Sequence, residues 1–199
     1  MSDSRLPTSK PFKKLSSNIV WSSPWYHVRR DELLLPDGRP GVYNIIEHPG
    51  AVWILPVTTT GEIVLVYHYR YTVDDWCWEI PAGGVQPGKT LAETAENELW
   101  EEVGGQAQAI AFAGRFYTAN GISKEIANIF LATGVELGLT DHEPAEIMEV
   151  HSKPIREVLR MARANEISDG PSALAILLCE QKLLEMAEQL ASNSITDGG

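Results

Sequence analysis

Short runs of apolar, β-branched and aromatic residues fill the first half of the chain and are separated by turn residues. This pattern predicts strands. The runs 25–35 and 41–48 flank the sequence PDGR, whose Asp-Gly pair is typical of a hairpin turn. The runs 51–57 and 62–70 flank the sequence TTTG, which predicts a second hairpin. A further strand is predicted at residues 126–134, where apolar residues again dominate.

The apolar spacing changes to a helical period between residues 91 and 103. One stripe of this predicted helix is expected to face a core, and it consists of Leu91, Ala95, Leu99 and Val103. Thr90 and Glu93 have the spacing of a capping box, and Gly104 can adopt the left-handed conformation that ends a helix. Two more helices are predicted at residues 154–165 and 171–191, the second with a proline in its first turn.

These elements together predict an α/β or α+β fold in which helices cover the faces of a mixed sheet. With 199 residues, one domain is the default expectation. We predict a flexible N-terminus at residues 1–17, a single domain at 18–190 and a flexible tail at 191–199. Within that domain, residues 18–48 are an N-terminal strand region and residues 49–190 are the core.

Composition and charge exclude several classes of partner. The formal net charge of −11 argues against nucleic acid, because binding there depends on neutralising backbone phosphates. A phosphate-bearing small molecule would need positive charge supplied locally, by a few arginines or a metal ion. Cys77 and Cys179 are too few for a disulfide framework and fit a reducing compartment. No signal peptide or membrane-spanning run is recognisable, so we predict a cytoplasmic protein without a membrane partner.

The helix at 91–103 carries an unusual load of carboxylates and no lysine or arginine. At 100° per residue, Glu98 and Glu102 lie within about 20° of Leu91, beside the buried stripe. Like charges four residues apart destabilise a helix by about 0.2–0.5 kcal/mol. Glu101 and Glu102 also occupy the last turn, where the helix dipole favours cations by about 0.3–1 kcal/mol per charge. A divalent cation, Mg²⁺ or Mn²⁺, would resolve this repulsion. The five histidines lack metal-ligand spacing and are interpreted as incidental.

The segment from Gly83 to Gly105 resembles the Nudix box, G-x5-E-x7-R-E-(apolar)-x-E-E-x-G-(apolar). The positions in register are Gly83, Glu98, Leu99, Glu101, Glu102 and Gly104. Three positions depart from the pattern. Lys89 stands where the family has its first glutamate, Asn97 replaces the arginine that helps to orient the next glutamate, and Gly105 replaces the final apolar residue.

Residues 20–180 resemble the branch of this family that contains ADP-ribose and nucleoside-diphosphate-sugar pyrophosphatases. The resemblance implies a Nudix α/β/α sandwich with a mixed sheet, preceded by an antiparallel N-terminal strand region. It implies a metal shell built from Glu98, Glu101, Glu102 and the carbonyl of Ala82. In the same way Arg70 is expected to contact phosphate. Gly83 and Gly84 would let the backbone approach a diphosphate closely.

The resemblance also implies a homodimer formed through the N-terminal strands, in which an aromatic residue of one subunit helps to hold the base bound by the other. Trp25, Tyr26 and Trp76 are aromatic residues that could stack on a nucleobase, and we select Trp25 as the substrate-binding residue. Glu125 matches the glutamate that serves as base or orients water, while Glu146 and Glu149 are rival positions. The loop before Glu125 has Ala119, Asn120 and Gly121 where the branch usually has Ser-Pro-Gly.

We therefore predict metal-dependent hydrolysis of the pyrophosphate bond of a nucleoside diphosphate linked to a sugar. ADP-ribose is the leading substrate, with AMP and ribose 5-phosphate as products. Glu125, Glu101 and Glu102 are the predicted catalytic residues. Two alternatives stay open at this point. One is a sensing domain that binds such a ligand without turning it over, which the residues at 89 and 97 suggest. The other is a Nudix hydrolase of GDP-mannose or a dinucleoside polyphosphate.

Overall fold

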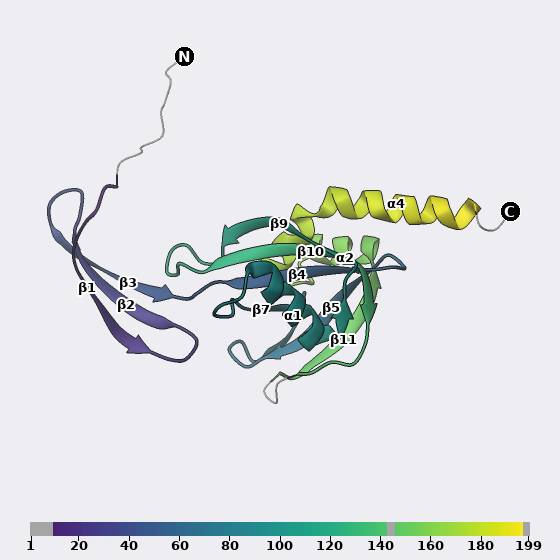
Figure 1. Ribbon diagram of the computed structural model, residues 1–199. Coiled ribbons are helices and arrows are strands. Elements are labelled where there is room, and N and C mark those ends of the chain that lie inside the picture. Colours follow the sequence, from purple (N-terminus) through teal and green to yellow (C-terminus); the bar gives the residue numbers. More distant parts are fainter. Residues whose placement is uncertain (1–9, 143–145, 197–199) are drawn as a thin grey trace, which may run out of the picture. The chain divides into compact units, whose positions relative to one another are not determined.

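The computed structural model describes residues 10–142 and 146–196 and divides the chain into two compact units (Figure 1). The first unit contains the described residues up to Pro49 together with Ala119–Glu125. The second unit contains Gly50–Thr118 and the described chain from Ile126 onward. The first three strands hydrogen-bond into a sheet of their own. The single domain at 18–190, with a strand region at 18–48 and a core at 49–190, stays a prediction.

The sheet of the first unit is antiparallel, as predicted. Its strands are β1 (Lys13–Ser22), β2 (His27–Leu34) and β3 (Pro40–Glu47), in the order β1-β2-β3. The hairpin between β2 and β3 is confirmed, and Gly38 in its turn has a φ of 84°. Strand β1 begins at Lys13 and pairs with β2 from there onward, as an exposed edge strand. The flexible N-terminus at 1–17 stays a prediction, and its residues 1–9 lie outside the described part of the chain.

The second unit is built on a mixed sheet of eight strands. They are β4 (Ala51–Thr58), β5 (Glu62–Arg70), β6 (Asp75–Glu79), β7 (Ala82–Gly84), β8 (Gly105–Gln106), β9 (Ala109–Tyr117), β10 (Ile126–Leu137) and β11 (Met148–Pro154). The main path runs β11-β5-β4-β10-β8, with β6, β7 and β9 pairing with β5, β4 and β10. Strands β4 and β10 are parallel, and the predicted β4–β5 hairpin is confirmed.

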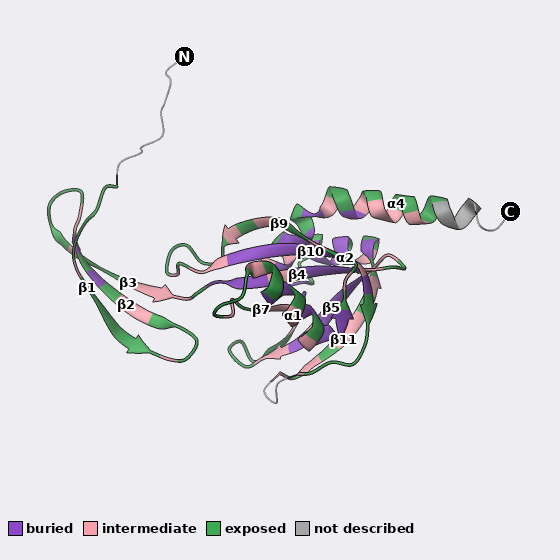
Figure 2. Ribbon diagram, viewed as in Figure 1, coloured by how far each residue is buried: buried purple, intermediate pink, exposed green. Residues whose placement is uncertain are grey.

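Helices cover both faces of this sheet, which confirms the predicted α/β/α sandwich. Neighbouring residues of β4 point to opposite faces of the sheet, and the two sets pack in different cores. Most of β4 is buried (Figure 2). Val52 and Ile54 pack in one core with helix α1 (Leu91–Val103). Leu55 and Val57 pack in the other core, together with α2 (Ile155–Arg163), α3 (Gly170–Leu178) and α4 (Glu180–Thr196). No helix in the part of the chain that the structure describes is long and apolar enough to cross a membrane.

The helix predicted at 171–191 is wrong in detail, because it is divided at Cys179 into α3 and α4. Ile176 before the break and Leu183 after it are fully buried in the same core as Cys179. Both helices bury apolar residues in this core. Helix α4 continues to Thr196. The flexible tail at 191–199 stays a prediction, and residues 197–199 lie outside the described part of the chain.

Helix α1 has the predicted bounds because its caps are local. The Thr90 hydroxyl accepts a hydrogen bond from the Glu93 amide at 3.2 Å, and the Glu93 carboxylate accepts one from the Thr90 amide at 2.7 Å. Gly104 ends the helix in the left-handed conformation, with φ at 63°. A Cβ atom at Gly104 would lie 2.5 Å from the carbonyl oxygen of Gly138.

We expect Gly104→Ala to destabilise the protein by more than the roughly 1–2 kcal/mol that a left-handed residue costs, because neighbouring backbone must also move. Urea unfolding followed by circular dichroism measures this free energy. Gly88→Ala is the matched control, since Gly88 has a φ of 82° but open space around its Cβ position. Equal losses in the two variants would mean that the approach of Gly138 costs nothing.

Candidate active site

The carboxylate of Glu102 is buried at the end of helix α1. Glu102 is 5% exposed, and its Oε2 atom accepts a hydrogen bond from the Ala82 amide at 3.1 Å. Burial raises the pKa of Glu102 well above 4.5, and the nearby charges of Glu98 and Glu146 raise it further. The Ala82 amide and the guanidinium of Arg70 oppose this shift. A buried anion beside other anions is costly unless a cation joins the group.

These acidic side chains line one cavity of about 510 Å³. Its lining residues are Ala82, Gly83, Gly84, Gln86, Glu98, Glu101, Glu102, Asp141, His142 and Glu146. The structure therefore brings Ala82, Gly83 and Gly84 together with the three glutamates of helix α1 around one cavity. Metal binding by these residues stays a prediction. Of the two rival bases, Glu146 lines this cavity, whereas Glu149 forms an ion pair with His151 at 3.2 Å.

Gly83 has an intramolecular role that the sequence analysis missed. A Cβ atom at position 83 would overlap the carboxyl group of Glu98, whereas one at Gly84 would meet nothing within 4 Å. The glycine at 83 thus makes room for a side chain of this chain. The predicted approach of a diphosphate to the backbone stays a prediction for both positions.

The side chain of Gln86 links Asn97 to Glu98. Its amide nitrogen donates to Glu98 Oε1 at 3.3 Å, and its oxygen accepts from the Asn97 amide nitrogen at 3.3 Å. Asn97, which departs from the family pattern, is thereby joined through Gln86 to the glutamate that follows it. Lys89, another of the three departures, is exposed in the turn before the helix.

The C-terminal carbonyl groups of helix α1 are capped by the segment around His142. The backbone amide of Asp141 donates to the Glu101 carbonyl at 2.9 Å, and His142 Nε2 lies 2.6 Å from the Glu102 carbonyl oxygen. This contact compensates in part for a last turn without basic side chains. From the sequence, His142 is interpreted as incidental. No spacing signal reveals it, since the two partners are 40 residues apart in the chain.

Arg70, the predicted phosphate contact, is engaged by a carboxylate in the structure. Its Nε and Nη2 atoms donate to the two oxygens of Glu79 at 2.8 and 2.5 Å. The side chain of Glu79 is 5% exposed and that of Arg70 is 41% exposed. Burial raises the pKa of Glu79, and Arg70 opposes this change. The contact of Arg70 with phosphate stays a prediction.

Glu125 and Trp25 lie in the first unit. Trp25 is 72% exposed, between β1 and β2. The loop before Glu125 adds to the edge of β3, because the Ile46 amide donates to the Ile122 carbonyl and the Lys124 amide to the Ile46 carbonyl. Glu125 is then held by two contacts: its amide donates to Ser123 Oγ at 3.0 Å, and its carboxylate lies 3.1 Å from His48 Nδ1.

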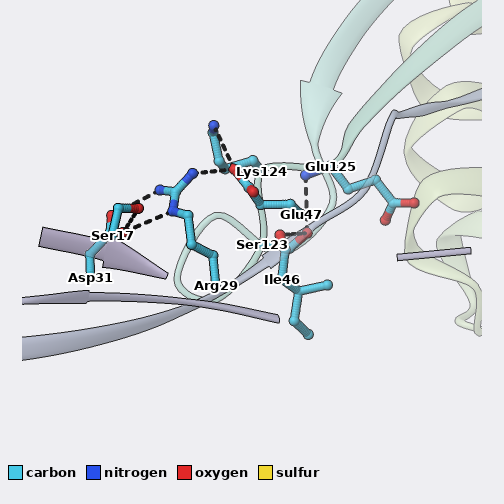
Figure 3. A network of polar contacts seen from close by, with 8 residues as sticks. All are labelled: Ser17, Arg29, Asp31, Ile46, Glu47, Ser123, Lys124 and Glu125. Atoms are coloured by element: carbon cyan, nitrogen blue, oxygen red, sulfur yellow. Dashed lines mark hydrogen bonds and ion pairs between the residues drawn. The ribbon is translucent and has the colours of Figure 1, made fainter. Parts of the chain in front are cut away.

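A polar network beside this loop ties it to the sheet (Figure 3). The Arg29 guanidinium donates to both oxygens of Asp31 and to Glu47, and Lys124 Nζ donates to the same Glu47 at 3.3 Å. Ser17 also donates to Asp31. The Arg29 guanidinium and Ser17 hold the pKa of Asp31 below its usual value. The roles predicted for Glu125 and Trp25 stay predictions.

His68 is a second histidine that the sequence did not single out. It is 6% exposed on β5, and its Nδ1 atom has no hydrogen-bond partner among the described residues. Burial lowers the pKa of His68 from 6.5 to about 4, with smaller contributions from Arg70 and His142.

We expect this histidine to weaken the fold in acid. Between pH 6.5 and 4, His68 binds a proton in the unfolded chain but stays neutral in the folded chain. The free energy of unfolding therefore falls as the pH is lowered. The loss attributable to His68 is about 2 kcal/mol after allowance for screening. In urea unfolding at pH 7.0 and 4.5, His68→Leu should lose less stability than the parent. Parallel losses would show that His68 does not titrate in this way.

The donor set around the cavity fits a hard divalent cation. Carboxylate oxygens are the ligands that Mg²⁺ and Mn²⁺ prefer, and Glu102 is a buried carboxylate with acidic neighbours. Among the residues that the structure describes, no three acidic, imidazole or thiol side chains stand in coordinating positions relative to one another. The carboxylates are thus gathered at one cavity but not arranged as a preformed coordination shell.

Comparisons with known proteins agree with this geometry. The NUDIX domain family matches residues 47–173, and the nucleoside diphosphate sugar hydrolase N-terminal domain family matches residues 12–46. An ADP-ribose pyrophosphatase of Bacillus subtilis (strain 168) is 31% identical over 175 residues, or 85% of this chain and 93% of that protein. An ADP-ribose pyrophosphatase of Mycobacterium tuberculosis is 35% identical over 170 residues, or 83% and 82% of the two chains.

A crystal structure of an ADP compounds hydrolase has the same fold, with a TM-score of 0.77 at 21% identity. The match covers 91% of this chain and 98% of that one. The sandwich, the glycine turn and the carboxylate-lined cavity, together with a family match over more than half of the sequence, show that the chain belongs to the Nudix family. It is a Nudix hydrolase, and the two relatives just described are named ADP-ribose pyrophosphatases.

Proposed function

We propose that this protein hydrolyses the pyrophosphate bond of ADP-ribose to give AMP and ribose 5-phosphate. The observation that carries the proposal is the cavity where Glu98, Glu101 and Glu102 meet the turn at Ala82–Gly84. Its lining is acidic, so a bound cation is needed before it can accept a diphosphate. The relatives named ADP-ribose pyrophosphatases support ADP-ribose over GDP-mannose or a dinucleoside polyphosphate.

In this proposal Glu98, Glu101, Glu102 and the Ala82 carbonyl hold Mg²⁺ or Mn²⁺. When bound, the metal would polarise phosphoryl oxygens and make a bound water more acidic. The water oxygen attaches to one phosphorus as the bridging P–O bond breaks, and a nearby glutamate accepts the proton of the water. Glu146 is supported for that role by its place in the cavity lining, and Glu125 by its match to the family pattern.

The first experiment is a substrate panel. ADP-ribose, GDP-mannose and a dinucleoside polyphosphate are each incubated with the protein and Mg²⁺, and the released nucleotides are quantified by chromatography. The proposal predicts the highest kcat/KM for ADP-ribose, with AMP as product. Tight binding of ADP-ribose without AMP would instead identify a sensing domain, and a faster rate with another diphosphate would replace the substrate.

The choice between Glu125 and Glu146 as the water-orienting glutamate is tested by Glu125→Gln and Glu146→Gln. The variant of the acting residue should lose about 10²–10⁴-fold in kcat with little change in KM. Glu149→Gln serves as the matched control, since Glu149 is paired with His151 outside the cavity lining.

We also propose a homodimer formed through the N-terminal strands. The three-stranded sheet of the first unit exposes many large apolar side chains, among them Leu15, Ile19, Val20, Trp21, Trp25, Tyr26, Val42 and Tyr43. Exposed apolar patches of this kind mark protein interfaces, and an edge strand such as β1 offers unpaired backbone groups. Light scattering after gel filtration should give a dimer, and Val20→Glu should shift it toward monomer. A monomeric parent protein would refute this proposal. The proposed location is the cytoplasm.

A further inference from the structure

Arg70 lies where its positive charge acts on the proposed metal site. Its electrostatic partners are Glu79, Glu102 and Asp169, and the first of these binds it with two hydrogen bonds. Glu102 belongs to the carboxylates that line the cavity. The charge of Arg70 therefore acts both on a buried carboxylate outside the cavity lining and on a buried carboxylate within it, while its hydrogen bonds go to the first.

An arginine next to a metal-binding carboxylate is a competitor of the metal. A guanidinium can pair with a carboxylate through two parallel hydrogen bonds, and such a pair would occupy the oxygens that a cation needs. In the structure the two hydrogen bonds go to Glu79, while Glu102 accepts from the Ala82 amide. Glu79 is itself buried, and its neighbour across the β5–β6 pair is the fully buried Val66. The carboxylate of Glu79 is thus a fixed anchor for the guanidinium.

We propose that Glu79 is a positioning residue that holds Arg70 away from the carboxylate of Glu102, so that Glu102 stays available to a divalent cation. The inference rests on the metal site of the proposed function. It assigns Glu79 no contact with metal or substrate, because Glu79 acts through Arg70.

The test is Mn²⁺ binding to the whole protein, measured by the electron paramagnetic resonance signal of unbound Mn²⁺, without substrate. Glu79→Gln should weaken Mn²⁺ affinity by about tenfold or more, as is usual when a residue supporting a metal ligand is changed. The double variant Arg70→Gln with Glu79→Gln should recover affinity close to that of the parent, because the competing guanidinium is gone. A merely structural role for Glu79 would not be rescued in this way.

Glu166→Gln is the matched control, since Glu166 also binds an arginine, Arg160, through both oxygens but on an exposed surface. It should leave Mn²⁺ affinity unchanged. Should Glu79→Gln not fold, Arg70→Gln alone decides: it should bind Mn²⁺ at least as tightly as the parent, and weaker binding would overturn the proposal.

Unchanged affinity in Glu79→Gln, or equal weakening in the single and double variants, would also overturn it. These outcomes differ from failure of the metal site itself. In that case the parent protein and Glu102→Gln would bind Mn²⁺ equally poorly, and the proposed function would fall together with this inference.

Discussion

Glu102→Gln should lower kcat on ADP-ribose by about 10²–10⁴-fold while the protein stays folded, because loss of a metal ligand removes several kcal/mol of transition-state stabilisation. Glu102 combines deep burial with acidic neighbours, so its charge is costly to the fold unless a cation is present. The glutamine keeps the volume and can still accept the hydrogen bond of the Ala82 amide. We therefore expect the variant to be at least as stable as the parent protein when metal is chelated.

Steady-state kinetics with Mg²⁺ and thermal unfolding in EDTA measure the two effects together. Glu96→Gln is the matched control, since Glu96 is on the same helix but exposed. It should leave both kcat and the melting temperature near the values of the parent. Activity of Glu102→Gln within a few-fold of the parent would refute the metal role of Glu102.

Gly83→Ala is expected to produce the second large loss, through the position of Glu98. The added Cβ atom would overlap the Glu98 carboxyl group. Glu98 has a flexible side chain, so it can swing aside at little cost to stability, but its oxygens then leave the cavity wall. We expect kcat to fall by about 10²-fold, since misplacement by about 1 Å can cost that much. Mn²⁺ affinity should fall as well.

Gly84→Ala separates the two roles that a glycine can have in this turn. A Cβ atom at Gly84 meets no other group, so Mn²⁺ affinity should be unchanged. A rise in KM for this variant would show that a diphosphate approaches the backbone at Gly84. Normal kcat and Mn²⁺ affinity in Gly83→Ala, with an unmoved Glu98 side chain in its crystal structure, would contradict the steric argument.

Helix α1 was predictable to its ends because its determinants lie within the segment itself. Thr90 and Glu93 cap its start, Gly104 ends it, and the apolar stripe selects the face that is buried. The hairpins were predictable for a similar reason, since turn residues and alternating patterns are local. The break at Cys179 was not, because residues 171–191 have continuous helical character. Helices α3 and α4 both pack in one shared core, which forms only in the folded chain.

Some residues of the candidate site can likewise be recognised from the sequence, and others cannot. The spacing of Glu98, Glu101 and Glu102 shows in the sequence that carboxylates are crowded at one end of a helix. Glu79, Gln86 and His142 gave no such signal, since each contacts its partner only after separate strands, turns and loops have packed.

The linear order of residues thus decided the acidic helix, its caps, the family to which the chain belongs and the class of chemistry. The helix, its caps and the box that marks the family depend on residues between Gly83 and Gly105, so short-range spacing is enough to encode them. Folding decided which carboxylate is buried, why Gly83 must lack a side chain and which anion holds Arg70. Those outcomes arise from contacts between β5, β6, β7 and α1, and a low-dielectric interior exists only when these elements have come together.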